Sequence, residues 1–158
     1  MGCLAALTFT LANPTLVKNL ILIGPPPSPL PEAATKNTYA REALVREKGM
    51  AAVVDAVTAA GTSSKTKESN PLAVAAVRMS LLGQEPESYA KACAALAGAT
   101  QKLDIEKVEA RTLIVTGEED KVSPPALVQK MEKAMGRCEV VLLKDVGHWH
   151  VFEDSKGV

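Results

Sequence analysis

Three short apolar runs stand out along the chain, and each is followed at once by a glycine or a tight turn. They are Leu20–Ile23, Leu113–Val115 and the less purely apolar Glu139–Leu143. Runs of this length without polar alternation are typical of strands covered on both faces, as in a parallel sheet. A helical pattern lies between the second and third runs, at Pro124–Met135, and alternating strands and helices indicate an α/β fold on a parallel sheet.

Between the first two runs the pattern changes to alanine-rich helical segments that end at glycines. Helices are expected over residues 38–48, 50–60, 71–82 and 87–98, with the polar tract Thr62–Asn70 as a mobile loop. Asn70 and Pro71 have the residue types preferred at a helix N-cap and first helical position.

These patterns divide the chain into a core and an insertion. Residues 32–108 are interpreted as an all-helical lid. Residues 1–31, with a helix over Gly2–Ala12 and the first strand, and residues 109–158, with the other two strands, are interpreted as the core.

Charge and composition exclude several kinds of partner. The chain has 18 basic and 18 acidic residues among 158 and no basic stripe, so no nucleic-acid partner is expected. No apolar run approaches the length of a membrane span, so no membrane partner is expected. Three widely spaced cysteines, an odd number, favour reduced thiols in a cytoplasmic protein over a disulfide framework.

Asp120 and His148 are the leading candidates for chemistry. Each follows a predicted buried strand after a glycine turn, and consecutive parallel strands bring such loops to one sheet edge. A carboxylate that accepts a hydrogen bond from an imidazole fixes its tautomer and stabilises the imidazolium, as in a nucleophile–histidine–acid triad. The chain order, acid before histidine, is that of α/β-hydrolases, in which the nucleophile precedes both.

Other readings of the neighbouring residues stay open. His148 and His150 could form a metal-binding pair, but no third ligand stands at a useful spacing, so a metal is not expected. The family function that is inferred below implies no organic cofactor either. Trp149 is expected to pack beside the histidine loop or to contact the substrate. Arg41 and Arg78 could bind a substrate carboxylate, although solvation at the surface is the commoner fate of such residues.

The segments TLIVTGEEDKVSPP and DVGHWHVFED resemble the acid loop and histidine loop of α/β-hydrolases. GMAAVVDAV and SYAKACAAL resemble lid helices of the 3-oxoadipate enol-lactonase type. The chain thus resembles the C-terminal portion of such an enzyme. The resemblance implies that Asp120 and His148 belong to a triad, and that Glu153 matches a typical downstream acid. It also implies that the nucleophile would stand just before Met1, whose backbone nitrogen corresponds to one oxyanion-hole donor.

The resemblance implies hydrolysis of a small-molecule carboxylic ester or lactone, with 3-oxoadipate enol-lactone as the leading substrate. Thr58–Gly61 stands where the lid of that family often has aromatic residues, so the substrate assignment stays open. Without a nucleophile in the chain, two alternatives remain. One is a catalytically inactive fragment or non-enzymatic binding relic, and the other is a dehalogenase or epoxide hydrolase with an aspartate nucleophile. An uncovered edge at Leu20–Ile23 would also favour self-association.

Overall fold

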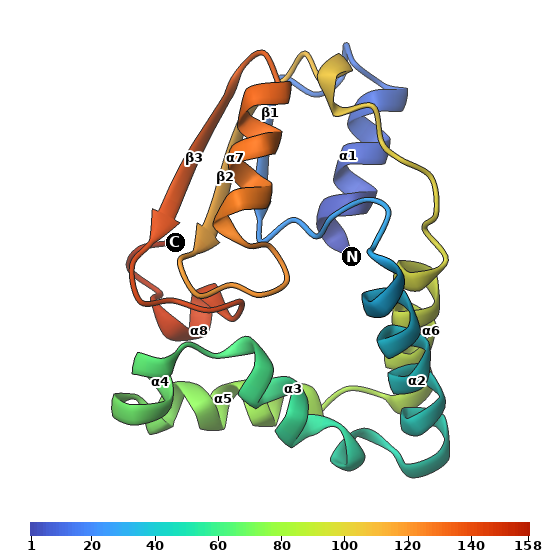
Figure 1. Cartoon of the computed structure of the whole chain (residues 1–158), viewed down its shortest axis with the longest axis vertical. Coiled ribbons are helices and arrows are strands. Elements are labelled where there is room, and N and C mark those ends of the chain that lie inside the picture. Colours follow the sequence, from blue (N-terminus) through green and yellow to red (C-terminus); the bar gives the residue numbers. More distant parts are fainter.

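A parallel three-stranded sheet forms the centre of the computed structural model, which describes residues 1–158 (Figure 1). The strands are β1 (Asn19–Ile23), β2 (Arg111–Gly117) and β3 (Cys138–Leu143), in the spatial order β1-β2-β3. Both neighbouring pairs are parallel, and Ile114 lies opposite Leu22 on one side and Val140 on the other. The three predicted strands and their parallel arrangement are confirmed.

Two helices cover one face of this sheet, α1 (Gly2–Ala12) and α7 (Pro125–Ala134). Their apolar side chains meet those of β1 and β2 in one core, whose most deeply buried members include Leu7, Leu22, Ile114 and Val128. Burial of each such side chain contributes roughly 1.5–3 kcal/mol. This core fixes the carboxyl ends of the strands, where the loops to the candidate site begin.

The other face of β1 is open. Leu20 and Leu22 are buried, but Ile21 between them is 65% exposed. The expectation of cover on both faces is therefore wrong for β1, because its outward residues are apolar without being packed. It is also wrong for β3, in which only Leu143 is buried. Under the ends of β2 and β3, that same face carries only a small cluster of Val115, Leu143 and Val146.

Five α-helices lie between β1 and β2 in the chain: α2 (Glu32–Lys48), α3 (Val54–Gly61), α4 (Ser64–Ser69), α5 (Pro71–Leu82) and α6 (Pro86–Ala97). Figure 1 shows α2 packed along α6 on the right, and α3, α4 and α5 in a layer below the sheet. Several of these helices share a second apolar core around Val45 and Val77. The helical segment thus packs as a unit, and its description as a lid stays an interpretation.

The polar tract predicted to be a mobile loop is largely helical. Ser63 accepts a hydrogen bond from the backbone N–H of Thr66 at 3.1 Å and caps α4, and both residues are buried. The predicted cap at Asn70 is confirmed, since its side-chain oxygen accepts from Ala73 N–H at 3.1 Å. The polar residues of this tract cap the helix and pack in its buried positions. Because these positions are not apolar, the tract lacks the apolar periodicity by which a helix is predicted.

The short helix α8 (His150–Glu153) connects the helical segment to the core. The Glu153 carboxylate accepts backbone N–H groups from Ser63 at 2.8 Å, Gly147 at 3.1 Å and Trp149 at 3.1 Å. Lys65 pairs with Asp145 across the same junction at 3.2 Å. None of the helices is both long enough and apolar enough to cross a membrane.

Candidate active site

The loops that follow β2 and β3 touch at Gly117. A Cβ at this position would lie 2.1 Å from the carbonyl oxygen of Val146 and 2.5 Å from that of Gly147, so the approach requires glycine. Glu118 N–H donates to the Leu143 carbonyl at 3.0 Å, and Glu119 N–H to that of Val146 at 2.9 Å. This close contact brings the acid loop and the histidine loop together, as expected from the adjacency of their strands.

Asp120 is held from both sides of its carboxylate, and the residue is only 2% exposed. Oδ1 accepts the backbone N–H groups of Val122 at 2.7 Å and Ser123 at 2.8 Å. Oδ2 faces Nδ1 of His148 at 2.9 Å. Two amide donors on one oxygen leave the other oxygen directed at the imidazole, so the orientation of Asp120 does not depend on His148.

Electrostatics keep the Asp120 carboxylate ionised. Burial acts to raise its pKa, but the nearby rings of His148 and His150 and the amide of Ser123 outweigh burial and hold the pKa well below its usual range. A carboxylate that stays charged can orient an imidazole and stabilise the imidazolium at any pH near neutrality.

His148 is positioned by its backbone as well as by Asp120. Its N–H donates to the carbonyl of Gly61 at the end of α3, at 2.6 Å. Gly24, which directly follows β1 and has a φ of 58°, lies next to the ring: a Cβ there would be 3.0 Å from Cε1 of His148. With Nδ1 turned to Asp120, Nε2 is the atom left for a reacting group, and the ring lines two cavities.

The sequence pairs His150 with His148 as a possible metal ligand but does not predict that it lies beside Asp120. Its Nε2 lies 3.1 Å from Oδ2 of Asp120, the oxygen that also faces His148, and the residue is 4% exposed. The contact lacks hydrogen-bond geometry, so this buried nitrogen has no partner. The statement that no third ligand accompanies the two histidines is thereby corrected, since Asp120 is distant in sequence but adjacent in space.

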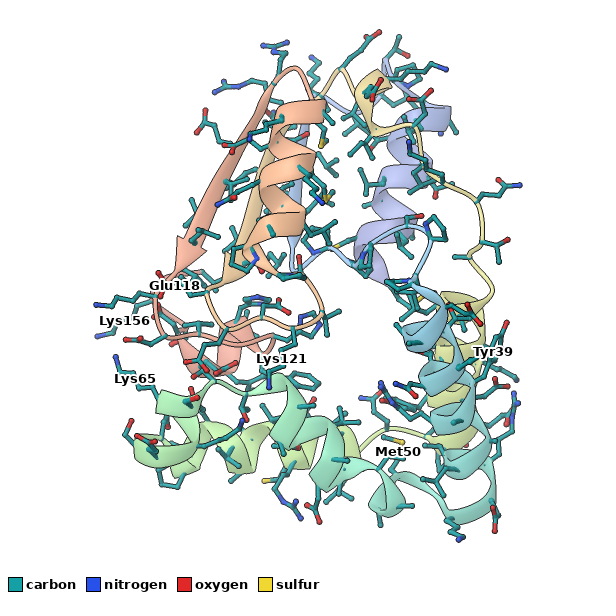
Figure 2. The ribbon with its side chains drawn as sticks, in the orientation of Figure 1. Tyr39, Met50, Lys65, Glu118, Lys121 and Lys156 are labelled. Atoms are coloured by element: carbon teal, nitrogen blue, oxygen red, sulfur yellow. The ribbon has the colours of Figure 1, made fainter.

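The larger cavity, of about 740 Å³, lies between the helical segment and the core. Its walls are mostly apolar side chains of α2, α3 and α6, and His148 and Trp149 close the core side. Two cations also line it: Arg41, from α2, and Lys121, which Figure 2 shows on the acid loop above α3. Arg41 lies near enough to Cys93 that its charge opposes the rise that burial causes in the pKa of that thiol.

The smaller cavity, of about 350 Å³, lies beside the first turn of α1. Met1 and Cys3 line it from one side, and His148 and His150 from the other. Met1 lines the same cavity as His148, which is compatible with its predicted role near an oxyanion; that role stays a prediction. Cys3 donates its thiol to the carbonyl of Ile23 at 3.3 Å, and burial raises its pKa, so it is no activated nucleophile.

Two of the other predicted contacts have different outcomes. Trp149 lines both cavities, and its indole packs so closely on Gly61 that a Cβ there would lie 2.4 Å from Nε1. Arg78 instead pairs with Asp55 and lines neither cavity, so its placement does not support the predicted role in substrate binding.

No family model and no curated protein matches the chain by sequence. Solved structures do match by shape. An esterase from Thermogutta terrifontis, solved with malate bound, has a TM-score of 0.86 and 23% identity, with 98% of this chain and 57% of that chain covered. The enol-lactonase from Burkholderia xenovorans LB400 has a TM-score of 0.84 and 21% identity, with 98% of this chain and 58% of that chain covered. MenH from S. aureus has a TM-score of 0.79 and 23% identity, with 97% of this chain and 60% of that chain covered.

The chain therefore spans less than two thirds of the length of these structures. The part they share includes the three strands and the flanking and intervening helices. Its fold is a partial α/β-hydrolase fold: three parallel strands with flanking helices, a helical insertion, and the loops of Asp120 and His148 at the ends of β2 and β3.

Proposed function

We propose that this chain carries the acid and the histidine of a triad that hydrolyses a carboxylic ester or lactone. The observation that supports the proposal best is the 2.9 Å contact between Asp120 Oδ2 and His148 Nδ1, beneath an apolar cavity. In this reading Asp120 holds the Nδ1–H tautomer of His148. Nε2 then takes the proton of the nucleophile and later returns it to the leaving group.

The nucleophile is outside residues 1–158 in this proposal. Two thiols line a cavity together with His148, Cys3 in the smaller one and Cys93 in the larger one, and burial raises the pKa of both, so neither is an activated nucleophile. A serine would lead to ester or lactone hydrolysis, whereas an aspartate in the same place would serve a dehalogenase or epoxide hydrolase. The similarity in fold to an esterase and to an enol-lactonase favours the first chemistry.

The larger cavity favours an apolar acyl group that carries a carboxylate. Its walls are mainly apolar, and Arg41 and Lys121 place positive charge within them. Arg41 lines the cavity from α2 and is a candidate to bind a substrate carboxylate, whereas Arg46 on the same helix lies outside the lining and is paired with Glu42 and Glu87. An enol-lactone of a dicarboxylic acid such as 3-oxoadipate has both features and is the leading substrate.

Binding without catalysis is the second candidate. The cavity is formed by residues 1–158 alone, so a ligand could bind in the absence of any nucleophile. The two candidates differ in what His148 does: in the first its Nε2 moves a proton, and in the second it only lines the wall.

An externally added nucleophile separates the two candidates. The assay follows acyl transfer from p-nitrophenyl butyrate to hydroxylamine, in which the acyl carbon–oxygen bond breaks, an acyl–nitrogen bond forms, and p-nitrophenol leaves. Under the proposal, His148 accepts the hydroxylamine proton, and transfer exceeds that of the His148→Ala variant by about tenfold or more. Asp120→Asn should lower the rate similarly, and the surface variant Glu68→Gln should not.

Equal rates of acyl transfer in the wild type and the three variants would show that His148 does not act as a base. That result would favour binding without catalysis. The sole tryptophan, Trp149, reports binding independently because it lines the cavity. A dicarboxylic acid lactone should quench or shift its fluorescence saturably, with weaker affinity in Arg41→Gln. Tighter binding of a haloalkane or an epoxide than of the lactone would contradict the substrate class.

A further inference from the structure

Three ligand-type atoms converge at one point of the site. Oδ2 of Asp120, Nδ1 of His148 and Nε2 of His150 all lie within 4.8 Å of one another. We propose that they form a binding site for a divalent transition-metal ion, with zinc as the representative of the class. The inference concerns these three side chains and does not depend on the hydrolytic function.

The first argument is the unpartnered nitrogen of His150. Its Nε2 is buried and has no hydrogen bond, although it lies 3.1 Å from a carboxylate oxygen. A buried polar atom without a partner costs roughly 1–3 kcal/mol. A metal ion would bind this lone pair directly, whereas the triad reading gives His150 no role at all.

The second argument is that one oxygen of Asp120 is held by backbone hydrogen bonds and the other is left to bind a metal ion. Its Oδ1 is occupied by the N–H groups of Val122 and Ser123, which leaves Oδ2 for coordination. The Thr116 hydroxyl lies 3.2 Å from Oδ2, but 2.7 Å from the Ser123 carbonyl, and its single proton is better donated to that carbonyl. Hydrogen bonds of this kind orient a ligating carboxylate and are typical of the surroundings of metal ligands.

The third argument is distance. In a tetrahedral site, zinc bonds of about 2.0–2.2 Å to nitrogen and oxygen separate neighbouring ligand atoms by about 3.3–3.6 Å. The two nitrogens lie 2.9 Å and 3.1 Å from Oδ2 and no two of the three atoms are more than 4.8 Å apart, so movement of the two rings would admit an ion. Gly24 makes room beside both rings, because a Cβ there would lie 2.7 Å from His150 Cε1 and 3.0 Å from His148 Cε1.

The types of the three ligands, and the cavity that leads to them, also fit a divalent transition-metal ion. Two imidazoles and one carboxylate are a common set for zinc and for iron(II), and they leave coordination positions for water or another small ligand. The smaller cavity, lined by both histidines, gives an ion a path to the site. Coordination through Nδ1 of His148 removes the hydrogen that this atom donates to Asp120, so metal binding and the Asp120–His148 hydrogen bond exclude each other.

Imidazole NMR tests the site directly, because the chain has only two histidines. Zinc chloride is titrated into the protein carrying Cys3→Ser and Cys138→Ser, which removes the two partly exposed thiols as competing ligands. The expected result is saturation at one equivalent, with the ring resonances of both histidines shifting together. Cobalt(II) should give the absorption bands of a coordinated ion with the same stoichiometry.

Single variants identify the ligands. His150→Gln and Asp120→Asn should each weaken zinc binding by about tenfold or more, while Glu68→Gln should leave it unchanged. His148→Gln, whose side chain is partly exposed, provides a third variant if a buried substitution prevents folding. Unchanged zinc affinity in the folded variants, or a shift of only one histidine at saturation, would overturn the proposal.

Discussion

At the scale of single residues, the site depends on how Asp120 is held. Its carboxylate combines two backbone N–H donors, the His148 ring and nearly complete burial. Charge-assisted hydrogen bonds are stronger than neutral ones, and their loss inside a protein leaves donors without acceptors. Asp120 is therefore expected to stabilise the fold as well as to orient His148.

Replacing Asp120 by asparagine should lower the free energy of unfolding at pH 7 by about 2–4 kcal/mol. The asparagine has nearly the same shape, but it has one acceptor oxygen where the carboxylate uses two. Urea denaturation followed by circular dichroism measures the difference. Glu68→Gln is the control, because it neutralises an exposed carboxylate on α4 by the same acid-to-amide change.

The same carboxylate should set part of the acid sensitivity. Its pKa in the folded protein lies well below the ordinary 3.8, so its stabilisation is complete above that value and is lost as the pH falls through the folded pKa. The free energy of unfolding of the wild type should therefore fall as the pH drops below about 4. Asp120→Asn should show a shallower fall in that range, and equal slopes would contradict the argument.

At the scale of elements, the contact between the acid loop and the histidine loop depends on two residues, Gly117 and Glu153. Gly117 permits β2 to pass within van der Waals contact of the histidine loop, and Glu153 of α8 bonds that loop to the start of α4. These contacts join three segments that are far apart in the sequence. The distance from Asp120 to His148 is thus a property of the junction between them.

Gly117→Ala should separate the acid loop from the histidine loop. The added Cβ would meet the carbonyls of Val146 and Gly147 at 2.1 Å and 2.5 Å, so backbone must move, at a cost of about 2–3 kcal/mol. The NMR resonance of the Nδ1 proton between His148 and Asp120 should weaken or disappear. Gly136→Ala is the control, since nothing lies within 4 Å of its added Cβ. An unchanged resonance in Gly117→Ala would contradict this view of the junction.

Glu153→Gln should loosen the helical segment from the core. Glutamine offers one acceptor oxygen to three backbone N–H groups and turns an N–H₂ toward the others, so local hydrogen bonds are lost. Ser63 donates to one carboxylate oxygen, and Gly147 and Trp149 donate to the other. Hydrogen exchange should accelerate by about tenfold or more at Ser63 or at Gly147 and Trp149, whichever side faces the N–H₂ group, at a cost near 1.5–3 kcal/mol. Amides in β2 should exchange as before. Glu68→Gln, an exposed change in α4, should leave exchange at all three amides unaltered, and equal effects of the two variants would contradict the role of Glu153.

The sequence predicts those features that depend on local pattern. The three apolar runs become strands, and Asn70 caps its helix as its residue type and the following proline indicate. Asp120 and His148 meet because parallel topology places them at one sheet edge. In contrast, α4 is not predicted, because its one buried position is Thr66 and no apolar residue marks a helical period. The contact of His150 with Asp120 depends on the turn into α8, which no periodicity reveals.

At the scale of the whole molecule, two apolar cores flank the larger cavity. One core lies between the sheet and its two covering helices, and the other lies inside the helical segment. Figure 1 shows these two groups of elements as separate parts of the molecule. Binding sites between separately packed units are common, because each unit supplies one rigid wall. A ligand in the cavity is therefore expected to shift the helical segment relative to the sheet at the contacts of Glu153. The packing inside each core should change little.

The open side of the sheet predicts self-association. β1 pairs only with β2, so its other edge presents unpaired backbone groups, and Ile21 beside them is 65% exposed. Unprotected strand edges of this kind pair readily with other chains.

Sedimentation velocity should show a weight-average mass that rises with concentration over the micromolar range. Ile21→Lys should shift that rise to concentrations about tenfold higher, because a charge on the strand opposes pairing. Leu72→Lys, an equally apolar and 79% exposed position on α5, should leave the rise unchanged. A monodisperse monomer that unfolds in one cooperative step would show instead that the bare edge of β1 is tolerated.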